Sequence, residues 1–134
     1  MTRKMMVMLV VASFFCLGMG GGVDVVSSIP KPDRVFNVRV VDATDTSYNA
    51  GQVSVDGVTF LPVRLGGAEL GVDFAKISRV RFYLQGETVA VAVTGRDGQD
   101  MPSMTMDPNI LFSGSTDWGN FRLKAKDIRE ISFQ

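Results

Sequence analysis

The sequence contains no histidine, and its single cysteine, Cys16, lies within the first twenty of its 134 residues. Histidine is the commonest general base and a preferred zinc ligand, and the cysteine thiolate is a common catalytic nucleophile. The chain after residue 20 therefore carries neither group and forms no disulfide. We expect a protein that is not an enzyme, that needs no cofactor, and whose stability rests on burial and sheet pairing.

An excess of charge of either sign is also missing, because 14 basic side chains stand against 14 acidic ones. Removing Arg3 and Lys4 with a leader leaves 12 basic side chains against the same 14 acidic ones. The chain has no clustered basic stretch of the kind that marks a nucleic-acid-binding surface. We therefore expect no nucleic-acid partner.

The first twenty residues follow the three-part pattern of a secretory signal peptide. The basic pair Arg3–Lys4 precedes an apolar run, Met5–Leu17, and small residues follow at Gly18 and Gly20. This order of basic, apolar and small residues predicts export, with cleavage after Gly20 or at the neighbouring Gly18 or Gly22. The mature protein would then be periplasmic or secreted.

Two alternatives to cleavage remain for residues 1–20. The apolar run is short for a membrane span, but it would serve as an uncleaved N-terminal anchor. Cys16 would alternatively accept a lipid, although Phe14–Phe15 replace the small residue that lipoprotein signals favour before the cysteine. The protein would contact a membrane in either case, and we expect no membrane contact otherwise. Residues 21–34, with Pro30 and Pro32, are predicted to form an extended, mobile linker.

Residues 35–134 show the period of two that is typical of strands, with turn residues between the segments. Only two short pieces resemble single helical turns, at 74–77 and 125–128. We therefore predict an all-β domain, a small antiparallel barrel or sandwich of about eight or nine short strands. The clearest alternating sets are Phe36/Val38/Val40, Val80/Phe82/Leu84 and Val89/Val91/Val93.

An internal repeat of two β units is predicted at an offset of 51 residues. This shift places Leu70, Val72, Ile77, Val80 and Phe82 on Phe121, Leu123, Ile128, Ile131 and Phe133. Repeats of this kind indicate duplicated supersecondary units. Three charged positions are matched by opposite charges: Asp73 by Lys124, Lys76 by Asp127, and Arg79 by Glu130. If the two units pair about a pseudo-two-fold axis, these groups would face one another.

The closing segment Gly114–Leu123, with the sequence GSTDWGNFRL, continues into DIREISF at 127–133. Together with Val53–Val58 and Phe74–Ile77, this segment resembles a group of small bacterial envelope proteins that are exported, β-rich and uncharacterised. The resemblance covers most of residues 35–134. It implies a β-rich fold in the cell envelope and implies no activity.

Methionines Met101, Met104 and Met106 gather in one short segment. Thioethers are soft ligands, so one hypothesis is a periplasmic Cu(I)-binding protein that uses these three side chains. Met104 and Met106 would share one face of a strand. The alternative is ordinary core packing, which is the usual role of methionine.

Trp118, the only tryptophan, precedes Gly119 in a predicted turn, and Arg122 and Lys124 follow on one strand face. A lone exposed tryptophan is a frequent interface anchor. We therefore expect a binding or structural module of the cell envelope that uses Trp118, Arg122 and Lys124. Its partner would be another envelope protein or a second copy of the chain.

Overall fold

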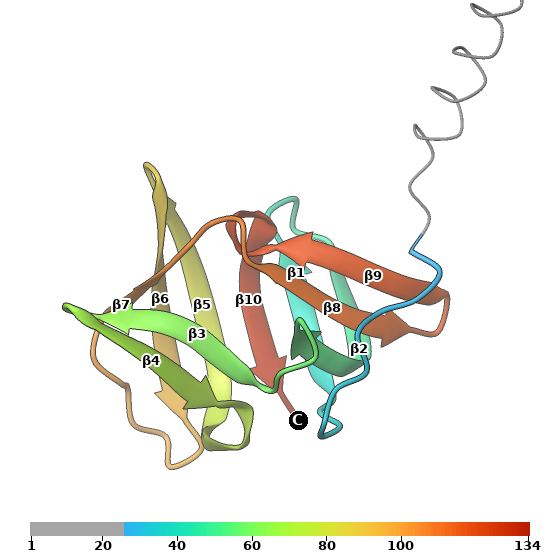
Figure 1. Cartoon of the computed structure of the whole chain (residues 1–134), viewed down its shortest axis with the longest axis horizontal. Helices are drawn as coiled ribbons and strands as arrows, with labels where there is room; N and C mark the ends of the chain where they lie inside the picture. The colour runs from blue at the N-terminus through green and yellow to red at the C-terminus, as the bar shows by residue number, and fades with distance from the viewer. Residues whose placement is uncertain (1–25) are drawn as a thin grey trace, which may run out of the picture.

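The computed structural model describes residues 26–134 (Figure 1). These residues form ten strands and two single turns of 3-10 helix, η1 (Phe74–Lys76) and η2 (Ala125–Asp127). The strands are β1 (Val38–Asp42), β2 (Ser47–Val55), β3 (Phe60–Leu65), β4 (Ala68–Asp73), β5 (Ile77–Gln85), β6 (Thr88–Gly95), β7 (Met104–Met106), β8 (Leu111–Thr116), β9 (Gly119–Lys124) and β10 (Ile128–Phe133). The predicted leader lies outside the described residues.

All ten strands belong to one antiparallel sheet with the order β4-β3-β7-β6-β5-β10-β1-β2-β8-β9. The sheet curls into a half-barrel whose two outer strands, β4 and β9, remain as edges (Figure 1). The predicted all-β antiparallel fold is confirmed, with ten strands rather than eight or nine. The two predicted single turns are also present, as η1 and η2.

The core lies on the inner face of this curled sheet, where alternate strand residues are buried, as the period of two predicts. The largest fully buried side chains include Phe74, Phe112 and Leu61. Leu84 differs from its prediction, because it is exposed. The reason is that β10 pairs with β5 only from Arg79 to Arg81, so the far end of the β5–β6 hairpin extends beyond its neighbour.

The predicted repeat is present with the same offset of 51 residues. The bounds of β3, β4 and η1 plus 51 give the bounds of β8, β9 and η2 without exception. β5 and β10 then pair with each other, and Val80 lies opposite Ile131, its own repeat counterpart. A pseudo-two-fold axis therefore passes between these two residues.

The sheet order reads as two matching halves around this axis. We call β3–β7 (residues 60–106) the first half, with the order β4-β3-β7-β6-β5. The second half has the matching order β9-β8-β2-β1-β10, so β1 and β2, from the start of the domain, complete it. Even the connections between halves match: Phe74 N–H donates to Thr59 O at 3.1 Å, and its counterpart Ala125 N–H donates to Ile110 O at 2.8 Å.

Only one of the three predicted charge pairs forms. Arg79 and Glu130 lie 3.1 Å apart, beside the axis. Asp73 instead pairs with Arg34 at 2.8 Å, and no ion pair joins Lys76 to Asp127 among the described residues. The reason is geometric. β5 and β10 run antiparallel with Val80 opposite Ile131, so two counterpart residues that are distant from this point lie at opposite ends of the strand pair.

Candidate functional site

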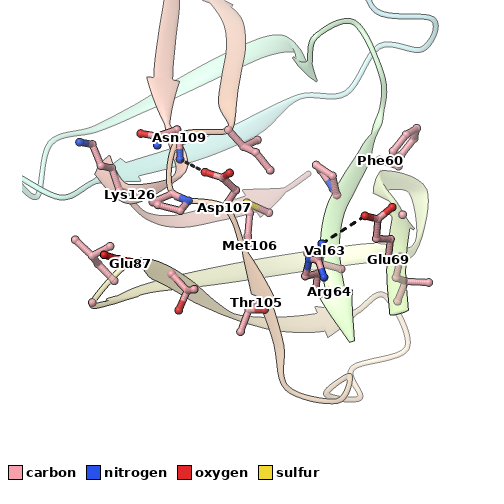
Figure 2. A pocket seen from close by; sticks show the side chains of 18 residues that line it. Phe60, Val63, Arg64, Glu69, Glu87, Thr105, Met106, Asp107, Asn109 and Lys126 are labelled. Atoms are coloured by element: carbon pink, nitrogen blue, oxygen red, sulfur yellow. Dashed lines mark hydrogen bonds and ion pairs between the residues drawn. The ribbon is translucent and has the colours of Figure 1, made fainter. Parts of the chain in front are cut away.

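An open groove of about 1170 Å³ lies on the first half. Its walls are the β3–β4 hairpin, the β5–β6 turn and the β7–β8 connection, with η2 at one end (Figure 2). A second hollow of about 460 Å³ adjoins it and shares Phe60, Pro62, Asp107, Asn109 and Ile110 with it. Together they form one depression that runs from the first half toward the junction of the two halves.

The groove has an apolar floor and charged margins. Met106 and Val63 lie at the centre of the view in Figure 2, and Phe60, Leu70 and Leu84 are large apolar side chains that remain exposed in its walls. Such a lining is typical of sites that bind apolar ligand groups while a few polar groups set their orientation.

Phe60 is held over the edge strand because Gly71 leaves room for its ring. A Cβ atom on Gly71 would lie 2.8 Å from a ring carbon of Phe60. Arg64 and Glu69 form an exposed ion pair at 3.5 Å at the same margin. On the opposite side Asp107 accepts a hydrogen bond from Asn109 N–H at 2.8 Å, which fixes the β7–β8 connection.

The matching region of the second half is covered by the chain itself. Residues 26–34, blue in Figure 1, form neither helix nor strand and run past β9, β8 and the β2–β3 connection. Asn120 Nδ2 donates to Ser27 O at 3.4 Å. A Cβ atom on Gly57 would lie 3.4 Å from Lys31 O and 3.5 Å from Pro30 Cβ.

These contact positions are the counterparts of groove residues. Asn120 and Thr59, which hold the segment, correspond to Glu69 and Ile110, and Gly57 corresponds to Pro108 in the β7–β8 connection. Glu69, Pro108 and Ile110 all line the open groove. The groove is therefore the first-half copy of a surface on which the second half carries an extended, proline-containing segment.

The segment ends in a network of hydrogen bonds around Thr59, a side chain that is only 1% exposed. Thr59 Oγ1 donates to Asp33 Oδ1 and accepts from Arg34 Nε, both at 2.9 Å. Arg34 Nη2 also donates to Thr59 O at 3.0 Å and to Asp73 Oδ1 at 2.8 Å. The last residues of the predicted linker, Asp33 and Arg34, are therefore fastened to the domain.

The Arg34–Asp73 contact changes the acid–base properties of both groups. The hydrogen bond from Arg34 lowers the pKa of Asp73. A second hydrogen bond, which Asp73 accepts from the Ala75 N–H, lowers it further. The same hydrogen bond, which Arg34 donates to Asp73, raises the pKa of Arg34. Both groups are therefore charged at neutral pH, and the ion pair between Arg34 and Asp73 helps to hold the segment on the domain.

The structure places the predicted binding residues on the second half, away from the groove. Trp118 is 85% exposed in the β8–β9 turn, and Arg122 and Lys124 are exposed on β9, an edge strand. The three residues therefore share the β8–β9 hairpin at the sheet edge, and their role in binding stays a prediction.

The predicted copper ligands are placed differently from one another. Met104 and Met106 are 2% and 3% exposed in the core, and Met101 is partly buried and packs against the core. Their burial favours the packing interpretation, and Cu(I) binding stays a prediction. Among residues 26–134 no group of three or more His, Cys, Asp or Glu side chains is arranged to hold a metal ion. In the same range every buried side-chain N or O atom has a hydrogen-bond partner.

Sequence reasoning missed the groove residues Phe60, Leu70 and Leu84. Two signals were available. Phe60 and Leu61 are adjacent apolar residues in a strand, so one of them must face away from the core. Leu84 lies near Gly86 at the tip of the β5–β6 hairpin, and the tip of a hairpin can extend beyond the neighbouring strands of the sheet.

Comparison with known proteins places the domain in a family. A family model described as "Uncharacterised protein" matches residues 32–134. This chain belongs to that family. An uncharacterised protein of Aquifex aeolicus (strain VF5) is 23% identical over 106 residues, which cover 77% of this chain and 80% of that protein. No solved structure matches the chain. The matched range includes Asp33 and Arg34, which fasten the segment to the domain.

Proposed function

We propose that this protein is an exported binding module of the cell envelope that holds an extended segment of another polypeptide in the groove of its first half. One observation carries the proposal: the counterpart surface of the second half already carries an extended segment of the same chain. The walls that contact residues 26–34 there have direct counterparts in the open groove. The resident segment thus serves as a template for the ligand.

The template gives the ligand its general chemistry. The contacts from Ser27 to Asp33 span seven residues, and an extended chain of that length covers about 23 Å. Proline favours such an extended form and lowers the entropy that binding removes. The groove is more apolar than the template surface at two positions, because Ile110 and Pro62 replace Thr59 and Ser113. We therefore expect a ligand with apolar side chains around a proline.

The test is a titration of the isotope-labelled protein with the heptapeptide Val-Ser-Ser-Ile-Pro-Lys-Pro, the sequence of residues 26–32. We expect amide chemical-shift changes at Leu70, Leu84 and Met106. Leu70→Glu, which places a charge in the apolar wall, should weaken binding by about tenfold or more, as loss of a central interface side chain does. Tyr83→Glu is the matched control, because Tyr83 is an exposed apolar side chain of β5 outside the groove.

Two results would contradict the proposal. Shift changes at Gly57 and Asn120 alone would mean that the peptide only replaces the resident segment on the second half. Equal affinity of the wild-type and Leu70→Glu proteins would place binding outside the groove.

A further inference from the structure

The β8–β9 turn presents Trp118 in a fixed conformation although the fold does not need it. Thr116 Oγ1 accepts hydrogen bonds from Trp118 N–H and Gly119 N–H, both at 3.2 Å, and donates to Gly119 O at 2.8 Å. The indole itself is 85% exposed. The counterpart position in the first half is Gly67, so the same hairpin closes without any side chain there.

The described chain begins beside this turn. Ser27 O accepts a hydrogen bond from the side chain of Asn120, which follows Trp118 by two residues. The sequence before Val26 carries the apolar run Met5–Leu17, and eight residues separate Leu17 from Val26. The nine Cα–Cα steps from Leu17 to Val26 reach at most about 32 Å when fully extended. A retained apolar run in a bilayer would therefore keep this edge of the domain within that distance of the membrane.

The charges of the same edge are compatible with a lipid surface. Arg122 and Lys124 are exposed on β9, on the strand face that also carries Asn120, and Lys31 is exposed on the adjoining segment. One acidic side chain, Asp117, lies in the turn itself. Tryptophan is enriched where protein meets the headgroup region, because its ring is apolar and its N–H remains hydrogen-bonded.

We propose that the β8–β9 turn is a membrane-contact element, with Trp118 in the headgroup region of the bilayer that holds the chain's uncleaved N-terminal run. Arg122 and Lys124 then face the lipid phosphates. Figure 1 shows this turn and the first half at opposite ends of the long axis, so the first half with its groove would lie at the end far from the membrane. This proposal does not depend on the groove having a peptide ligand.

The experiment uses the full chain in vesicles of phosphatidylcholine and phosphatidylglycerol. Trp118 is the only tryptophan, so its fluorescence reports on this turn alone. Replacing the phosphatidylcholine by its dibrominated form should quench the Trp118 emission, and insertion should shift its maximum to the blue. The matched control is the double variant Trp118→Phe/Tyr83→Trp, which moves the fluorophore to an exposed position on the first half. Its emission should not respond to the brominated lipid.

Equal quenching of both proteins, or quenching of neither, would overturn the proposal. Failure of the full chain to float with the vesicles would overturn it as well, since the chain would then make no stable membrane contact.

Discussion

The two halves of the sheet share one plan but differ in what lies on them. In the second half the segment 26–34 covers the surface and is bonded to it through Thr59 and Asn120. In the first half the same surface is an open groove, with Ile110 and Glu69 at the matching positions. The common framework therefore sets the shape, and a few substitutions decide whether the chain fills the surface or leaves it open.

The halves also differ in how two facing positions on their edge hairpins are filled. Val63 lies opposite Leu70 in the first half, whereas Gly114 lies opposite Phe121 in the second. The large side chain of the second pair fills the space that the glycine leaves. A Cβ atom on Gly114 would lie only 2.5 Å from a ring carbon of Phe121. The two pairs therefore fill the same space in different ways, and a side chain added at Gly114 alone would meet the Phe121 ring.

The largest effect is expected from disrupting the second pair with Gly114→Val. The added side chain displaces Phe121, whose ring packs at 5.4 Å on Tyr48, and overpacking of this kind costs about 2–3 kcal/mol of unfolding free energy. Urea denaturation measures it. The double variant Gly114→Val/Phe121→Leu copies the first-half pair and should recover most of the loss. A double variant no more stable than the single one would mean that the two halves are not interchangeable at this pair.

A smaller effect is expected from Thr59→Val, which makes the covered surface resemble the open groove, where Ile110 occupies the matching position. The change keeps the side-chain volume but removes the hydroxyl that joins Asp33 and Arg34. Loss of such buried hydrogen bonds costs about 1–2 kcal/mol. Denaturation gives the stability, and hydrogen exchange of residues 26–37 should show earlier opening of the segment.

Thr105→Val is the control for this prediction, because Thr105 is exposed on β7. It should change stability by less than about 0.5 kcal/mol. Unchanged exchange of the segment in Thr59→Val would show that Pro30 and Asn120, rather than the Thr59 network, hold it in place.

The repeat, the strands and the two helical turns could be predicted because their signals are local. Alternation within a strand and glycine at a turn depend only on neighbours in sequence, and both recur after 51 residues. The role of β1 and β2 could not be predicted in this way. They complete the second half through pairing with β10 and β8, at separations that no local pattern reports.

The groove was missed for a related reason. Phe60, Leu70 and Leu84 follow the same apolar pattern as core residues, and their exposure depends on β4 being an edge and on the β5–β6 hairpin projecting. The Thr59 network joins residues 25 or 26 positions apart through side-chain geometry. Trp118, in contrast, could be placed correctly, because a single large residue beside a turn glycine has no partner strand to bury it.

The smallest expected effect is on the pH dependence of stability. Here Asp73 is compared with its repeat counterpart, Lys124. The hydrogen bond from Arg34 lowers the pKa of Asp73 in the folded state. The folded protein therefore binds this proton less readily than the unfolded chain, whose aspartates titrate near pH 4. The stability from the bond is fully present above about pH 4 and is lost as pH falls through the lowered, folded-state pKa.

Asp73→Asn isolates this contribution because asparagine can still accept the hydrogen bond from Ala75 N–H that Asp73 accepts at 2.9 Å. The variant should be less stable than the wild type at pH 7, and the difference should shrink as the pH falls toward 2. Thermal denaturation across this range measures it.

Asp42, whose pKa is lowered by the Thr44 hydroxyl, is present in both proteins, so its titration cancels in the difference. Lys124→Gln changes no group that titrates in acid and should run parallel to the wild type. A constant difference between Asp73→Asn and the wild type from pH 7 to 2 would mean that Arg34 holds the segment through Thr59 alone.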